Sequence, residues 1–97
     1  PVKRNYEITV ILRPDPNEDT INEQIDEVQG WVQAENLGTI TKLDRWGRRK
    51  LAYEIDKQRE GYYVMIYADL ESRGVPELER NLTLAQYVLR HMLIRPD

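Results

Sequence analysis

The sequence contains no cysteine, so it can form no disulfide, zinc–thiolate site or thiol nucleophile. It also lacks any apolar run near the roughly 20 residues that a bilayer-spanning helix needs. The first residues, Pro1 to Tyr6, place no hydrophobic segment behind their charges and therefore do not form a secretory signal. A chain that opens on Pro1 is expected to have lost an initiator residue or to have been trimmed. These absences are compatible with a reducing cytosol.

Residues that commonly carry catalysis are also scarce. The single histidine, His91, lies in the last predicted strand between apolar neighbours, where a structural role is more common than catalysis or metal binding. No second histidine stands at ligand spacing. Gly47 and Gly61 are isolated glycines rather than parts of a phosphate-binding loop. The sequence therefore predicts no enzyme, no metal site and no cofactor.

Positive charge is missing from one long stretch and concentrated in the next. The chain has 17 acidic and 14 basic residues, for a net charge of −3, but residues 14–41 contain no Lys or Arg. The segment Lys42–Arg59 then holds half of all the basic residues. One part of the molecule can therefore repel a polyanion while another part binds it.

Hydrophobic periodicity predicts the order strand, helix, long strand, strand, helix, strand in a single domain over residues 1–97. This is the α+β, ferredoxin-like split βαβ arrangement, a four-stranded antiparallel sheet with two helices on one face. The predicted core residues are Ile8, Val10, Leu12, Ile25, Val28, Ile66, Leu78 and Leu82.

Local signals predict where the elements begin and end. The first helix has a capping-box pattern at Thr20–Glu23, with Asp15 as a rival start, and Gly38 is a candidate stop because glycine accepts the left-handed conformation. Ile40 and Leu43 are three residues apart, which breaks strict alternation in the long strand, and a bulge or twist near Trp46–Gly47 would reconcile them. Residues 58–61 are typical of a turn.

The strongest strand, residues 62–70, should present its odd-numbered side chains to the face that the helices leave open. Tyr63, Met65 and Tyr67 would lie there beside Thr9 and Ile11 of the first strand. Exposed tyrosines and a methionine suggest a contact surface. Because the strand lacks the Lys/Arg-Gly-aromatic pattern of the common single-strand RNA-recognition module, this surface is interpreted as one for a protein partner.

The cluster RWGRRK, residues 45–50, has two interpretations. It can be a solubilising charged hairpin, or a polyanion site in which arginines make bidentate contacts with phosphates. Trp46 can stack on an unpaired base or brace the hairpin. Gly47 would let the backbone turn. Such cations give affinity that falls with salt but do not by themselves read sequence.

The runs WGRRKLAYEI and EGYYVMIYAD, with RNYEITVILRPD and VLRHMLIRPD at the two ends, resemble the bacterial small-subunit ribosomal protein S6 family over essentially the whole chain. The resemblance implies a structural component of the small ribosomal subunit in the cytoplasm, with an organellar ribosome as an open alternative. It implies binding to the central domain of small-subunit ribosomal RNA together with the eighteenth small-subunit ribosomal protein (S18), no membrane, and a monomer when isolated.

The resemblance and the charge pattern together give two sets of candidate residues. Those expected at the RNA are Arg4, Arg45, Trp46, Arg48, Arg49, Lys50, Tyr53 and Arg90. Those expected at the partner protein are Tyr63, Met65, Tyr67 and Ile11. Two other classes stay open: a module that binds protein only, and a metabolite or metal sensor that forms oligomers through its sheet.

Overall fold

The computed structural model describes residues 2–96, which form one sheet of four strands and two α-helices. The strands are β1 (Lys3–Leu12), β2 (Gly38–Ile55), β3 (Gln58–Glu71) and β4 (Val88–Ile94); the helices are α1 (Glu18–Val32) and α2 (Val75–Leu84). Two short 3-10 helices, η1 (Ala34–Asn36) and η2 (Ser72–Gly74), follow α1 and precede α2.

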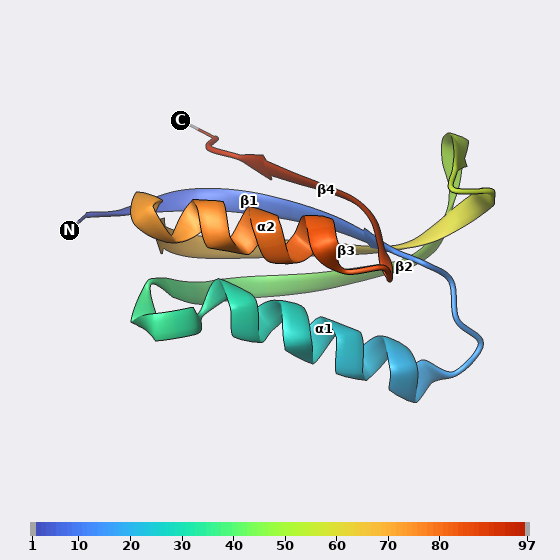
Figure 1. Cartoon of the computed structure of the whole chain (residues 1–97), viewed down its shortest axis with the longest axis horizontal. Helices are drawn as coiled ribbons and strands as arrows, with labels where there is room; N and C mark the ends of the chain where they lie inside the picture. Colours follow the sequence, from blue (N-terminus) through green and yellow to red (C-terminus); the bar gives the residue numbers. More distant parts are fainter. Residues whose placement is uncertain (1, 97) are drawn as a thin grey trace.

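The strands lie in the order β2-β3-β1-β4, and each neighbouring pair is antiparallel. Both helices run along one side of the sheet and leave its other side open (Figure 1). The predicted ferredoxin-like arrangement is confirmed. β2 and β3 are longer than the other strands, so the hairpin that joins them extends past the ends of both helices.

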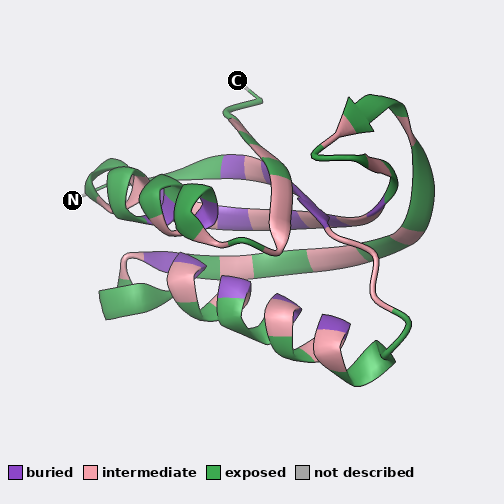
Figure 2. Cartoon of the chain, turned by 45° about the vertical axis from the view of Figure 1, so that its right-hand side comes forward, coloured by how far each residue is buried: buried purple, intermediate pink, exposed green. Residues whose placement is uncertain are grey.

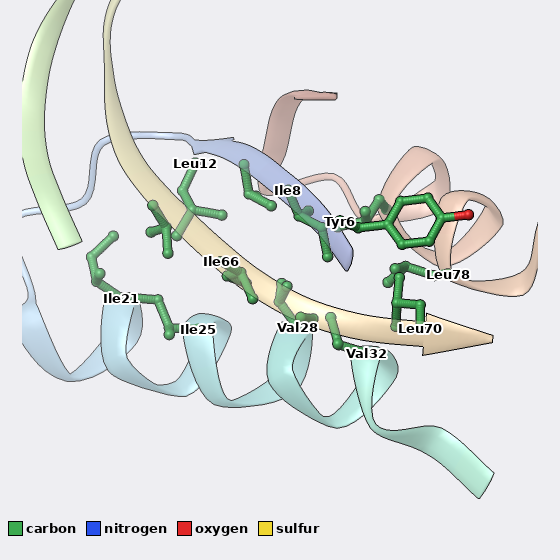
Figure 3. Packing of buried hydrophobic residues seen from close by; sticks show 14 residues of the cluster. Tyr6, Ile8, Leu12, Ile21, Ile25, Val28, Val32, Ile66, Leu70 and Leu78 are labelled. Atoms are coloured by element: carbon green, nitrogen blue, oxygen red, sulfur yellow. The ribbon is translucent and has the colours of Figure 1, made fainter. Parts of the chain in front are cut away.

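The core lies between the sheet and α1 and α2 (Figure 3). Alternate residues of β1 and β3 point into it because successive strand side chains face opposite sides. In α1, the apolar stripe Ile21, Ile25, Val28 and Val32 is buried. All eight predicted core residues are at most 4% exposed, which confirms the predicted register of both central strands.

The start of α1 differs from both predicted starts. Asn17 is the N-cap, and its side-chain oxygen accepts a hydrogen bond from the backbone N–H of Asp19 at 2.9 Å. Asp15 acts one step earlier, where its carboxylate accepts from the Asn17 N–H at 2.8 Å. Thr20 lies inside the first turn of the helix, so the capping-box prediction was wrong.

Gly38 does not stop the helix by adopting a left-handed conformation. The helix ends at Val32, and Glu35 and Asn36 carry the positive φ values, 55° and 58°. Gly38 instead begins β2, where an added Cβ would lie 2.2 Å from the carbonyl oxygen of Val32. Glycine is required there by the close approach of the strand to the end of the helix.

The turn between β2 and β3 lies at Asp56–Lys57 rather than at the predicted residues 58–61. Both turn residues have positive φ, 49° and 65°, and Ile55 pairs with Gln58, which is the geometry of a two-residue hairpin loop. Gly61 lies inside β3, where an added Cβ would approach Ile11 to 2.3 Å. The glycine in the predicted turn therefore serves strand packing.

Candidate nucleic-acid interface

The β2–β3 hairpin carries most of the predicted cluster of cations. It rises beyond the helices at the right of Figure 1, and most of its residues are exposed (Figure 2). Arg48, Arg49 and Lys50 lie in its β2 arm and are exposed. A projecting, two-stranded arm with exposed cations can reach a phosphate backbone without moving the rest of the domain.

A bulge at Trp46 lets the long β2 strand continue into this arm. The register with β3 shifts between Arg45, which pairs with Val64, and Gly47, which pairs with Tyr63. Gly47 has a φ of 82°, in the left-handed region that favours glycine. A bulge is therefore confirmed at the predicted place, but it does not explain the broken alternation between Ile40 and Leu43, where the register shifts separately between Ile40 and Lys42.

Arg45 is directed toward the helices and makes contacts within the protein. Its Nη1 donates to Asn22 of α1 at 2.7 Å, its Nε donates to the Tyr62 hydroxyl at 3.0 Å, and its Nη2 lies 3.3 Å from a carboxylate oxygen of Glu18. The guanidinium also lies 5.5 Å from the centroid of the Tyr62 ring. Arg45 therefore links the base of the hairpin to the acidic helix.

Arg48 and Arg49 lie on opposite faces of the arm. Arg48 pairs with Tyr62, whose side is covered by the helices, and its Nη1 lies 4.0 Å from Glu60. Arg49 pairs with Gly61 on the open side, and its guanidinium carbon lies 5.1 Å from the centroid of the Trp46 ring. The bulge comes before both residues, so it does not bring them to one face.

Trp46 braces the protein's own open face. Its ring stacks on that of Tyr63, with centroids 6.5 Å apart and planes 10° from parallel. The residue is nevertheless 47% exposed. Of the two interpretations that the sequence left open, bracing is the one present in the free protein.

The open face of the sheet combines apolar and polar side chains. Tyr63, Met65 and Tyr67 are half-buried there, and Thr9 donates a hydrogen bond to the Met65 sulfur at 3.1 Å. The ammonium group of Lys42 lies 5.5 Å from the centroid of the Tyr67 ring. The expected partner residues thus adjoin Trp46 and Arg49 of the expected RNA set on one surface.

Ile11 contributes little to this surface, because it is only 7% exposed and packs against Gly61. Two residues of β4 contribute more, and the sequence analysis missed them. Met92 and Ile94 pair with Thr9 and Glu7, so they share the open face, and they are 45% and 43% exposed. Period-two alternation in the last strand was the signal that could have found them.

Two contacts hold the hairpin tip against the rest of the sheet. Arg90 of β4 donates from Nη1 to the hydroxyl of Tyr53 at 2.6 Å. Arg13, directly after β1, forms an ion pair with Asp56 of the turn. Both Tyr53 and Arg90 belong to the expected RNA set, and the structure brings them together from strands that are not neighbours.

Arg4 lies apart from the other candidates. It pairs with buried Leu70 near the start of β1, at the end of the sheet away from the hairpin. The acidic residues of α1, including Glu23 and Asp26, are exposed on its outer surface. The cations of the hairpin and the acids of the helix therefore occupy different parts of the molecule, except where Arg45 joins them.

Two titratable residues away from the hairpin, His91 and Tyr87, lie beside glutamates of the helices. His91 lies 3.9 Å from Glu79 of α2 and is half-buried. Burial, together with the hydrogen bond to Glu27 and the negative charge of that residue, raises the pKa of Tyr87 above its ordinary range.

Among residues 2–96, no three His, Cys, Asp or Glu side chains are grouped as a metal site. None of the helices in this range is long and apolar enough to cross a membrane.

Sequence comparisons point to one family. The family described as Ribosomal protein S6 matches residues 5–95. The chain is 46% identical to small ribosomal subunit protein bS6 of Alkaliphilus metalliredigens (strain QYMF) over 91 residues, which cover 93% of this chain and 94% of that protein. It is 45% identical to bS6 of Nocardia farcinica (strain IFM 10152) over 94 residues, which cover 97% and 98% of the two proteins.

Solved structures agree with this assignment. The crystal structure of 30S ribosomal protein S6 from Thermotoga maritima superposes with a TM-score of 0.89 at 31% identity, covering 96% of this chain and 87% of that one. The C-terminal domain of MgtC from Mycobacterium tuberculosis, at 12% identity and a TM-score of 0.61, shares the fold alone. The chain belongs to the ribosomal protein S6 family, whose curated relatives are structural proteins of the small ribosomal subunit and not enzymes.

Proposed function

We propose that this protein binds the central domain of small-subunit ribosomal RNA together with S18, as a structural component of a ribosome in the cytoplasm. The observation that carries the proposal is the joining of two surfaces. A projecting hairpin with exposed Arg48, Arg49 and Lys50 adjoins an open sheet face with exposed Trp46 and Met92. Cations suit phosphates, and an open apolar face suits a protein partner.

The charge distribution supports this division of roles. The acidic outer surface of α1 would face solvent, and the hairpin would face RNA. Because the apolar side chains of the open face are only half-covered in the free chain, their burial by a partner would stabilise the complex. The isolated chain is proposed to be a monomer that binds no small-molecule substrate.

A binding titration tests the proposal. A transcript of the RNA central domain is titrated with this protein alone, with S18 alone and with both, at several salt concentrations. The pair should bind more tightly than either protein, with affinity that falls as salt rises. A transcript of another domain of the same RNA serves as the control. Absence of binding by the pair at low salt contradicts the proposal, and a ligand-bound homo-oligomer in native mass spectrometry would favour a sensor instead.

A further inference from the structure

The hairpin tip is held by two contacts to distant parts of the chain, the Arg13–Asp56 ion pair and the Arg90–Tyr53 hydrogen bond. We call them the tip clamp. We propose, on the basis of the proposed RNA-binding function, that the tip clamp holds the hairpin in its RNA-binding conformation before RNA binds. Asp56 is then a positioning residue that raises the affinity for RNA despite its negative charge.

The fixed side of the ion pair is Arg13. Its backbone N–H donates to the carbonyl oxygen of Tyr87 at 2.8 Å, and its side-chain Nε donates to that of Gln86 at 2.7 Å. Arg13 is thus tied to the segment that leads into β4, and it uses Nη2 for Asp56. The Arg13 side chain is 36% exposed and that of Asp56 is 60% exposed, so the clamp joins an anchored residue to a projecting one.

The tip needs such support because its own pairing is irregular. The register of β2 with β3 shifts between the pair Lys50–Glu60 and the pair Ile55–Gln58. A two-stranded hairpin is marginally stable in water by itself. A mobile hairpin would lose conformational entropy on binding, whereas a preset one has already lost it during folding.

If only charge mattered, removing the negative charge of Asp56 would strengthen RNA binding, which is the opposite of what the tip clamp predicts. Between residues 45 and 61 the hairpin carries three acidic residues, Glu54, Asp56 and Glu60, and any of them should repel a polyanion. Glu54 pairs with Arg59 at 3.3 Å within the hairpin itself. Replacing Glu54 with a neutral residue therefore frees the Arg59 guanidinium and leaves the tip attached to Arg13. Neutralising Asp56 also removes a negative charge, but it detaches the tip from Arg13.

The test compares Asp56→Asn with Glu54→Gln, two changes that each remove one negative charge from the same hairpin. Asparagine tolerates the left-handed conformation of residue 56, so the turn is kept. Affinity is measured for the central-domain transcript with S18 present. Asp56→Asn should bind about two- to five-fold more weakly than the unchanged protein, the effect of losing an exposed ion pair. Glu54→Gln should bind more tightly. If Asp56→Asn also binds more tightly, the positioning role is refuted.

A second measurement needs no RNA. Amide hydrogen exchange over residues 52–60 of the free protein should be faster in Asp56→Asn and in Arg13→Gln, and the double variant should exchange no faster than the single ones. Unchanged exchange in Asp56→Asn overturns the clamp, whatever the RNA result. Faster exchange combined with an absence of RNA binding by the unchanged pair would instead count against the proposed function alone.

Discussion

The indole ring of Trp46 and the phenol ring of Tyr63 stack across the β2–β3 pair, and the Arg49 guanidinium lies over the indole. The two aromatic residues come from the sets expected for RNA and for the partner protein. Their contact makes those sets parts of one surface. Mutations on this surface therefore need a control elsewhere on the domain before a loss of binding is assigned to one partner.

Replacing Tyr63 and Met65 together with Ser should weaken binding to S18 and leave the monomer folded. Both side chains are half-buried on the open face, so their loss removes apolar area that a partner would cover and little of the core. Leu84→Ser is the matched control, because Leu84 is 65% exposed on α2, away from the open face. Equal loss of partner affinity in the control, measured by calorimetry, would contradict the assignment.

Strand alternation and helical periodicity were sufficient to predict the fold and the core. Ile8 and Ile66, from strands that are distant in sequence, are both 0% exposed, and they pair with each other in the sheet. The α1 stripe around Ile25 and Val28 is likewise buried. These positions could be predicted because burial on one face imposes a fixed period on the sequence.

The contacts of individual cations could not be predicted in the same way. Arg45 and Arg48 both pair with residues on the helix-covered side of β3, but only Arg45 lies beside α1 and bonds to Asn22, which is distant in sequence. The ion pair of Asp56 with Arg13 depends on how far the long hairpin curves back toward β1. A local sequence pattern specifies which residues are charged and does not specify such long-range curvature.

Arg45→Gln should destabilise the domain more than Arg48→Gln. Arg45 hydrogen-bonds Asn22 and Tyr62, so its loss should lower the free energy of unfolding by about 1–2 kcal/mol. Arg48 is exposed, and its nearest carboxylate, Glu60, is 4.0 Å away, so its loss should change that free energy by less than about 0.5 kcal/mol. Urea unfolding measures both. Equal costs would show that the Arg45 contacts contribute nothing.

Ile25→Ala and Leu78→Ala should each lower the free energy of unfolding by about 2–5 kcal/mol, because each leaves a cavity in a close-packed core. These residues lie in α1 and α2 and are 4% and 2% exposed. Ile94→Ala, at an aliphatic residue that is 43% exposed, is the control and should cost less than about 1 kcal/mol. A near-zero cost at both core positions is incompatible with the observed packing.

Tyr87 should make the protein less stable at alkaline pH. Its ring stacks on Trp31 of α1, with centroids 6.3 Å apart, and burial beside Glu27 raises its folded-state pKa. Because that pKa is higher than the unfolded value of about 10, the unfolded chain releases the proton first, and stability falls as pH rises above about 10. Below that pH the contribution is fully present. Unfolding midpoints between pH 8 and 11 should therefore fall more steeply for the unchanged protein than for Tyr87→Phe. Parallel curves would exclude this contribution.

Arg48→Ala combined with Arg49→Ala should weaken RNA binding by the complex with S18 and flatten its salt dependence. Each cation that contacts a phosphate contributes on the order of one unit to the slope of log affinity against log salt, and somewhat less for single-stranded RNA. Because the two arginines lie on opposite faces of the arm, the single variants should differ. Replacing the arginine that contacts phosphate should lower the slope. Replacing the other should change affinity mainly through the neighbour it leaves, which is Glu60 for Arg48 and Trp46 for Arg49. Arg80→Ala, which removes an exposed cation of α2 away from the hairpin, is the control and should keep both affinity and slope. An unchanged slope in the double variant, with S18 present, would remove the hairpin from the RNA interface.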